Sequence, residues 1–149
     1  MKILRDYLYM DASDRGACAA IGNFDGVHLG HQSVIALAQQ TVPDAPLGVL
    51  TFEPHPRAFF APDAPPFRLM SPEARASRLE KLGVDYLFEI NFNHALAALT
   101  PDIFAERVIR DGFGLRHVIV GADFCFGKAR SGTADDLASF GAAMGFGVT

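Results

Sequence analysis

Short apolar runs alternate along the chain with segments that carry helix signals. Four runs are long enough for a buried strand and too short for a helix, and they cover residues 17–22, 46–52, 84–90 and 115–121. A repeated order of strand, helix and strand is typical of parallel strands joined by crossover helices. The pattern therefore predicts an α/β fold built on a parallel sheet.

Helix-capping residues set the bounds that we expect for the helices. In residues 71–83 and again in residues 100–114, a hydroxyl side chain precedes a proline at the first helical position, and a glycine closes the segment. A further helix is expected from near residue 28 to about residue 40. Three prolines in residues 61–70 predict a surface loop. The last residues, FGVT, resemble the start of a strand, so we expect the domain to continue beyond them.

Composition and charge narrow the class of protein. A chain of 149 residues suits one domain, and half of its residues are hydrophobic, so we expect a folded core. No apolar run approaches the roughly 20 residues that span a bilayer. The net charge of -4 argues against nucleic acid and anionic membranes as partners. Two cysteines far apart in the sequence, Cys18 and Cys125, form no disulfide framework, and we expect a reducing cytoplasm.

The segment GNFDGVHLGHQ, residues 22–32, is the strongest candidate for a binding site. It follows a predicted strand and opens a predicted helix, and ligands of parallel α/β sheets bind beyond the carboxyl ends of the strands. Its glycines allow a ligand to approach the backbone closely, and the N–H groups at a helix start attract phosphate. His28 and His31 are one helical turn apart, so they would add donors on one face. The segment therefore predicts a phosphate site.

Two other interpretations of His28 and His31 stay open. Zinc-binding histidines on a helix are usually four residues apart with a glutamate between them, whereas these are three apart with Gly30 between them. A metal site would also need His55, which only the fold could bring close. Alternatively, both histidines lie on the surface without a ligand.

Two further loops follow the ends of predicted strands. In TFEPHPRAFF, residues 51–60, two prolines hold His55 and Arg57 in a stiff loop that suits a second phosphate contact, or that forms a plain structured turn. In GADFCFGKARSG, residues 121–132, Asp123 could hold magnesium or a ribose hydroxyl, and two phenylalanines could line a flat pocket. The alternative is that both phenylalanines are core residues and that the nearby cations are solvated.

Together, these motifs resemble those of a known enzyme family. G-x-F-D-G-V-H-x-G-H is the pattern of nucleotidyltransferases that use an H-x-G-H motif on the phosphates of ATP or CTP. Residues 51–60, 69–93 and 118–137 narrow the resemblance to the FMN adenylyltransferase module of bacterial bifunctional riboflavin kinase/FAD synthetases. The resemblance implies a Rossmann-like parallel sheet with helices on both faces. It also implies the formation of FAD from ATP and FMN, with magnesium and with release of pyrophosphate.

The resemblance further implies roles for individual residues. His28 and His31 would bind the ATP phosphates and stabilise the transition state. The expected nucleotide contacts are Gly22, Asn23, Phe24, Asp25, Gly30 and Asp123. The expected phosphate or flavin contacts are His55, Pro56, Arg57, Phe59 and Phe126. Asp123 is also the expected magnesium ligand, whereas Asp25 could instead support the turn and Phe59 could anchor its loop.

The family pattern extends further than this sequence. It continues into an I-S-S-T-x-x-R segment and a riboflavin kinase domain, and these 149 residues contain neither. We therefore expect an incomplete adenylyltransferase domain with low turnover by itself. The alternatives are another H-x-G-H nucleotidyltransferase and a non-catalytic module that binds nucleotide or flavin.

Overall fold

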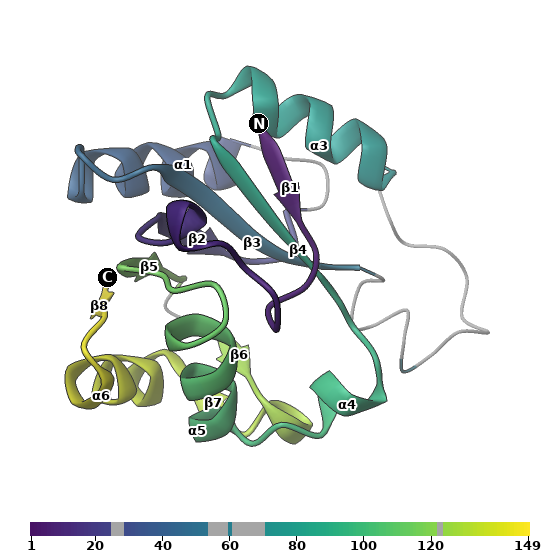
Figure 1. Cartoon of the computed structure of the whole chain (residues 1–149), viewed down its shortest axis with the longest axis vertical. Coiled ribbons are helices and arrows are strands. Elements are labelled where there is room, and N and C mark those ends of the chain that lie inside the picture. The colour runs from purple at the N-terminus through teal and green to yellow at the C-terminus, as the bar shows by residue number, and fades with distance from the viewer. Residues whose placement is uncertain (25–28, 54–59, 61–70, 122–123) are drawn as a thin grey trace.

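The fold is a parallel sheet between two layers of helices (Figure 1). The computed structural model describes residues 1–24, 29–53, 60, 71–121 and 124–149. Neighbouring strands of its six-stranded sheet are all parallel, in the order β1-β4-β3-β2-β5-β8. These strands are β1 (Lys2–Leu4), β2 (Cys18–Ile21), β3 (Leu47–Glu53), β4 (Tyr86–Asn91), β5 (His117–Ile119) and β8 (Gly147–Val148).

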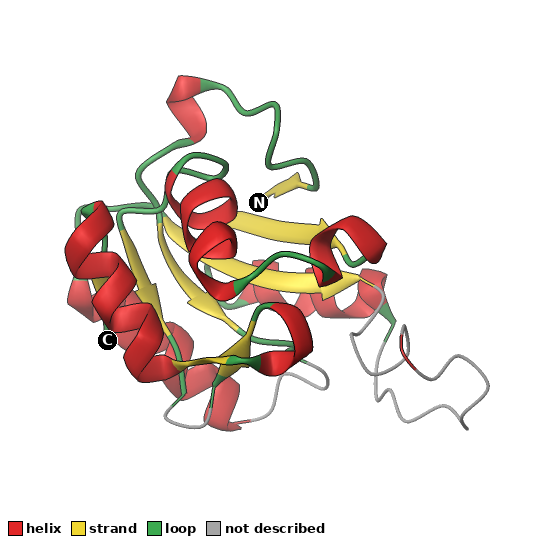
Figure 2. Cartoon of the chain, turned by 90° about the horizontal axis from the view of Figure 1, so that it is seen from below, coloured by secondary structure: helices red, strands yellow, loops and turns green. Residues whose placement is uncertain are grey.

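Helices cover both faces of the sheet (Figure 2). One face packs against α1 (Leu29–Thr41) and α3 (Pro72–Lys81). The other face carries α4 (His94–Ala97), α5 (Pro101–Phe104), a π-helical segment (Ala105–Arg110) and α6 (Ala134–Met144). The smaller elements are the antiparallel pair β6 (Cys125–Phe126) and β7 (Gly132–Thr133) and the 3₁₀ turns Ala12–Asp14 and Lys128–Arg130. Within the described residues, every helix is too short or too polar to cross a bilayer.

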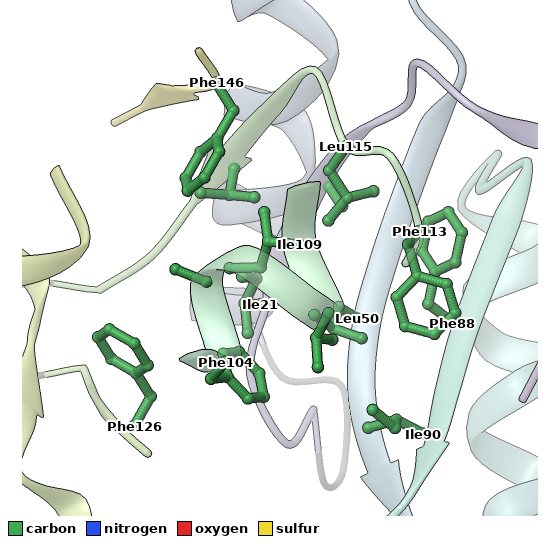
Figure 3. Packing of buried hydrophobic residues seen from close by; sticks show 14 of the residues in the cluster. Ile21, Leu50, Phe88, Ile90, Phe104, Ile109, Phe113, Leu115, Phe126 and Phe146 are labelled. Atoms are coloured by element: carbon green, nitrogen blue, oxygen red, sulfur yellow. The ribbon is translucent and has the colours of Figure 1, made fainter. Parts of the chain in front are cut away.

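Side chains alternate between the two faces of each strand, and this alternation divides the apolar core into two clusters. In β2, Ala19 and Ile21 face the layer that contains α5 and α6, whereas Ala20 faces α1 and α3. All three are buried, because helices cover both faces of the parallel sheet. Figure 3 shows the larger cluster, in which the ring centroids of Phe88 and Phe113 are 4.8 Å apart.

The expected strands and helices are confirmed, with differences at some helix ends. Ser71 caps α3, since its hydroxyl accepts from the Ala74 N–H at 3.1 Å. The Thr100 hydroxyl does not cap α5 but donates to the Asp102 carboxylate at 2.6 Å. The second half of that expected helix, Ala105–Arg110, is π-helical rather than α-helical. The closing FGVT does contribute a strand, β8, which pairs with β5.

The sequence pattern did not predict β1, α4, α6 or the β6–β7 pair. β1 has three residues, which are too few to show a period. α6 did carry a signal, because the Thr133 hydroxyl accepts from the Asp136 N–H and the Asp136 carboxylate accepts from the Thr133 N–H. This reciprocal pair is a capping box, which marks a helix start.

A polar network attaches β1 at the amino end of the sheet. Lys2 Nζ lies 2.8 Å from one carboxylate oxygen of the buried Asp14, and the Tyr86 hydroxyl donates to the other at 3.0 Å. The hydrogen bond from Lys2 holds the pKa of Asp14 below its usual range, and the same bond raises the pKa of Lys2. The ion pair therefore stabilises the edge strand opposite the carboxyl ends of the strands.

Candidate functional site

The strand order reverses at β2. From β2 the chain builds β3 and β4 on one side, and it later adds β5 on the other side of β2. The carboxyl ends of β2 and β5 are therefore neighbours at the point of reversal, where open α/β sheets bind ligands. Two of the three segments that the sequence marks as candidates directly follow these strands.

A tight turn, Gly22–Phe24, follows β2. The Gly22 N–H donates to the Leu50 carbonyl at 3.1 Å and so continues the strand pairing. Phe24 has a left-handed backbone (φ 52°), which is rare for a residue with a large side chain, and only 2% of it is exposed. A Cβ atom at Gly22 would lie 3.2 Å from the Phe24 ring, so the close approach favours glycine. The buried ring and the glycine hold this uncommon backbone in place.

His31 lies beside this turn, on the first turn of α1. Its ring centroid is 4.9 Å from that of Phe24, with the rings at 47°, and the side chain is half-buried. The structure therefore brings together three residues of the predicted phosphate site, Gly22, Phe24 and His31, at the carboxyl end of β2.

Asn23, in the middle of the turn, is attached to two other elements. Its carbonyl accepts from Oγ1 of Thr51 in β3 at 3.1 Å and from Nη1 of Arg75 in α3 at 3.2 Å. Its own Oδ1 atom is buried and has no hydrogen-bond partner among the described residues. Buried polar atoms are normally satisfied, so this oxygen is an acceptor that a ligand could use.

Arg75 is the centre of a buried charge network that the sequence analysis missed. Its side chain is 2% exposed, and its Nη2 atom lies 3.2 Å from Glu53 and 3.3 Å from Glu89. Arg5 lies 3.2 Å from the other carboxylate oxygen of Glu89. The two members that are almost fully buried, Arg75 and Glu89, pair with each other, and the charges of the four residues balance, which makes this burial tolerable. Signals were present: Glu89 interrupts an apolar strand, and Arg75 is four residues before the buried Leu79 on α3.

The segment after β5 contributes phenylalanines to the core. Phe126 is 5% exposed, and its ring centroid lies 5.6 Å from Phe124, 5.8 Å from Phe104 and 6.5 Å from Phe140. This is the placement that the core interpretation describes, and a flavin contact by Phe126 stays a prediction. The nearby Lys128 and Arg130 are exposed.

Several predicted residues lie outside the described part of the chain. They are Asp25, His28, His55, Pro56, Arg57, Phe59 and Asp123. Gly30 lies within α1. In the described ranges, no three His, Cys, Asp or Glu side chains are placed to hold a metal ion. The zinc interpretation and the magnesium prediction both involve residues beyond those ranges, so both stay open.

Comparison with known proteins places the chain in a family. The model of the FAD synthetase family matches residues 10–149. Three curated relatives are bifunctional riboflavin kinase/FMN adenylyltransferases. The Pseudomonas fluorescens protein is 39% identical over 99% of this chain and 48% of its own length. The Bacillus subtilis protein is 40% identical over 79% of this chain and 39% of its own length. The Escherichia coli K12 protein is 34% identical over 100% of this chain and 49% of its own length.

The chain thus spans about half the length of the curated relatives that it matches. The fold also has a solved counterpart, a Streptococcus pneumoniae protein described as a macrolide-efflux protein. It superposes with a TM-score of 0.83 at 25% identity, over 99% of this chain and 49% of its own. That likeness supports the fold rather than the activity in the description. Because the family model matches nearly the whole chain, the chain belongs to the FAD synthetase family.

Proposed function

We propose that this domain transfers the adenylyl group of ATP to FMN, giving FAD and pyrophosphate. The match of residues 10–149 to the FAD synthetase family carries this proposal. The geometry supports it, because a strained glycine-containing turn and His31 lie together where the strand order reverses. The names of the relatives include the same adenylyl transfer.

The reaction is a displacement at phosphorus. A phosphate oxygen of FMN forms a bond to the α-phosphorus of ATP, while the bond to the oxygen that bridges to the β-phosphate breaks. Pyrophosphate leaves with that electron pair, and no covalent bond to the protein forms. The protein therefore acts by positioning the two phosphates and by stabilising developing negative charge.

His31 suits this task by its place on the helix. A helix start presents backbone N–H groups that have no intrahelical acceptors, and the positive end of the helix dipole favours an anion there. His31 lies in the first turn of α1. We propose that the His31 imidazole adds a directed donor to the ATP phosphates and that His28 does the same. The Asn23 Oδ1 atom, which has no hydrogen-bond partner among the described residues, would accept from an adenine or ribose donor.

The remaining contacts are proposals from the sequence. Further nucleotide contacts are Gly22, Phe24, Asp25, Gly30 and Asp123. Phosphate or flavin contacts are His55, Pro56, Arg57, Phe59 and Phe126. Bound magnesium would neutralise charge on the ATP phosphates, and a carboxylate such as that of Asp123 is the ligand type that it prefers.

Two wider aspects are also proposals. The curated relatives are bifunctional, and the chain spans 48% of the Pseudomonas fluorescens protein. We therefore assign riboflavin phosphorylation only to a protein that also contains the other half of such a relative. The cytoplasm is the location that we propose, because the reaction uses ATP and neither Cys18 nor Cys125 forms a disulfide.

A turnover assay tests the function. The chain is incubated with ATP, magnesium and FMN, while FAD and pyrophosphate are quantified and the binding of ATP and FMN is measured by calorimetry. We expect FAD and pyrophosphate in equal amounts, and a large loss of rate in the His31→Ala variant. Binding of both substrates without any product would favour a non-catalytic binding module. Turnover of ATP with another phosphate acceptor but not with FMN would indicate a different nucleotidyltransferase.

A further inference from the structure

The buried Arg75 has more partners than the folding of α3 requires. It lies on the buried face of that helix, yet its guanidinium reaches the turn after β2 and the carboxylates of β3 and β4. An apolar side chain would fill the same position between helix and sheet without the cost of burying a charge. The contacts of the guanidinium therefore point to a role beyond packing.

The contact with the turn constrains one peptide group. The Asn23 carbonyl has two donors, Thr51 Oγ1 and Arg75 Nη1, and so both of its lone pairs are used. A trans peptide is planar, and its N–H points opposite to its carbonyl. Fixing the Asn23 carbonyl toward Thr51 and Arg75 therefore directs the Phe24 N–H to the other side of the turn. The same two bonds help to hold Phe24 in its left-handed conformation.

The two carboxylates fix the guanidinium in turn. Glu53 ends β3 and Glu89 lies in β4, and both are bonded to Nη2, while Nη1 bonds the turn. The planar guanidinium fork allows these contacts at the same time, whereas a lysine ammonium is a single point of charge. Arg75 thereby couples the orientation of the turn to the rigid sheet.

We propose that Arg75 is a positioning residue for adenylyl transfer, which it supports by fixing the Asn23–Phe24 peptide together with Thr51. This inference rests on the proposed function for its kinetic consequence, but its structural part does not. Arg75 contacts neither substrate in this scheme. Its effect reaches the phosphates through the turn that carries the binding groups.

The test compares two variants that act on the same carbonyl. Arg75→Lys keeps the charge but removes the fork, and Thr51→Val removes the second donor while keeping the shape of the side chain. The double variant completes a double-mutant cycle. Arg5→Gln is the matched control, because Arg5 belongs to the same charge network but bonds Glu89 rather than the turn. Its side chain is 65% exposed, so its loss should disturb the fold little.

The first readout needs no substrate. Amide exchange of Gly22, measured by NMR in the unliganded chain, reports the stability of the turn, since that N–H bonds the Leu50 carbonyl. We expect exchange to rise by about tenfold in both Arg75→Lys and Thr51→Val, which is the effect of losing one hydrogen bond. In both variants, amides at the centre of β3 should keep their exchange rates. In Arg5→Gln, all amides should keep their exchange rates. Unchanged Gly22 exchange in both variants would overturn the inference, whatever the chain catalyses.

The second readout is kinetic. We expect kcat for FAD formation to fall by about 10- to 100-fold in Arg75→Lys, with KM for FMN nearly unchanged, as expected when reacting groups are misplaced. The loss in the double variant should be smaller than the product of the single losses, because both residues act on one carbonyl. Losses that multiply, or an equal loss in Arg5→Gln, would indicate general destabilisation and would refute a positioning role. Faster exchange in a chain that makes no FAD would instead count against the proposed function alone.

Discussion

Replacing Arg75 with Met tests the energetics of the buried charge network. Arg75 and Glu89 are 2% and 6% exposed, and Glu53 is 28% exposed, so removing the guanidinium leaves two carboxylates in a largely dry site. Arg5 still pairs with Glu89 but is 65% exposed. Removing one partner of a buried ion pair typically destabilises a protein by about 3–5 kcal/mol. We expect the free energy of unfolding to fall within that range.

The measurement is urea unfolding followed by far-UV circular dichroism, because the chain contains no tryptophan for fluorescence. With a slope of about 2 kcal/mol per molar urea, the expected loss lowers the midpoint by about 1.5–2.5 M. Adding Glu89→Gln to Arg75→Met should restore part of the loss, since it removes the negative charge of one buried carboxylate. A midpoint within about 0.5 M of the unmodified chain would refute the reasoning. A double variant less stable than Arg75→Met would do so as well.

Four further substitutions test other parts of the structure. His31→Ala should lower kcat for FAD formation by about 10²–10³-fold, as the loss of a transition-state donor does, and its unfolding midpoint should change little. A rate near that of the unmodified chain would remove His31 from the mechanism. Asp14→Asn should alter the response of stability to acid. Because the pKa of Asp14 is lowered in the fold, its ionised carboxylate stabilises the fold above the unfolded pKa of about 4, and this stabilisation is lost as the pH falls through the folded pKa. The difference in urea midpoint between the unmodified chain and Asp14→Asn should therefore be larger at neutral pH than in strong acid, and an equal difference at both would contradict this. Gly48→Ala places a Cβ atom 2.8 Å from the Phe88 ring between buried strands, so the free energy of unfolding, measured with urea, should fall by about 1–3 kcal/mol. At Gly83, a Cβ atom would have no such neighbour among the described residues, so Gly83→Ala tests the cost of positive φ alone.

The features that the sequence predicted are those set by neighbouring residues. Apolar runs such as residues 46–52 form strands because burial on both faces of a parallel sheet requires continuous hydrophobicity. The Ser71 cap and the proline after it act within one turn of helix, so the start of α3 could be placed. The glycine-rich turn and His31 were also predictable, because a motif of eleven residues follows one strand and opens one helix.

What only the tertiary structure decided depends on residues distant in the chain. The burial of the Phe126 ring against Phe104 and Phe140 depends on the packing of α5 and α6, which no local pattern predicts. Arg75 contacts Asn23, 52 positions earlier in the chain, because α3 packs against the same face of the sheet as α1, beside β2 and β3. Strand order is set by the summed packing of both sheet faces and not by any one segment. The sequence alone therefore determined most of the strands and helices and the position of the predicted phosphate motif, whereas the fold decided which charged groups contact the turn in that motif.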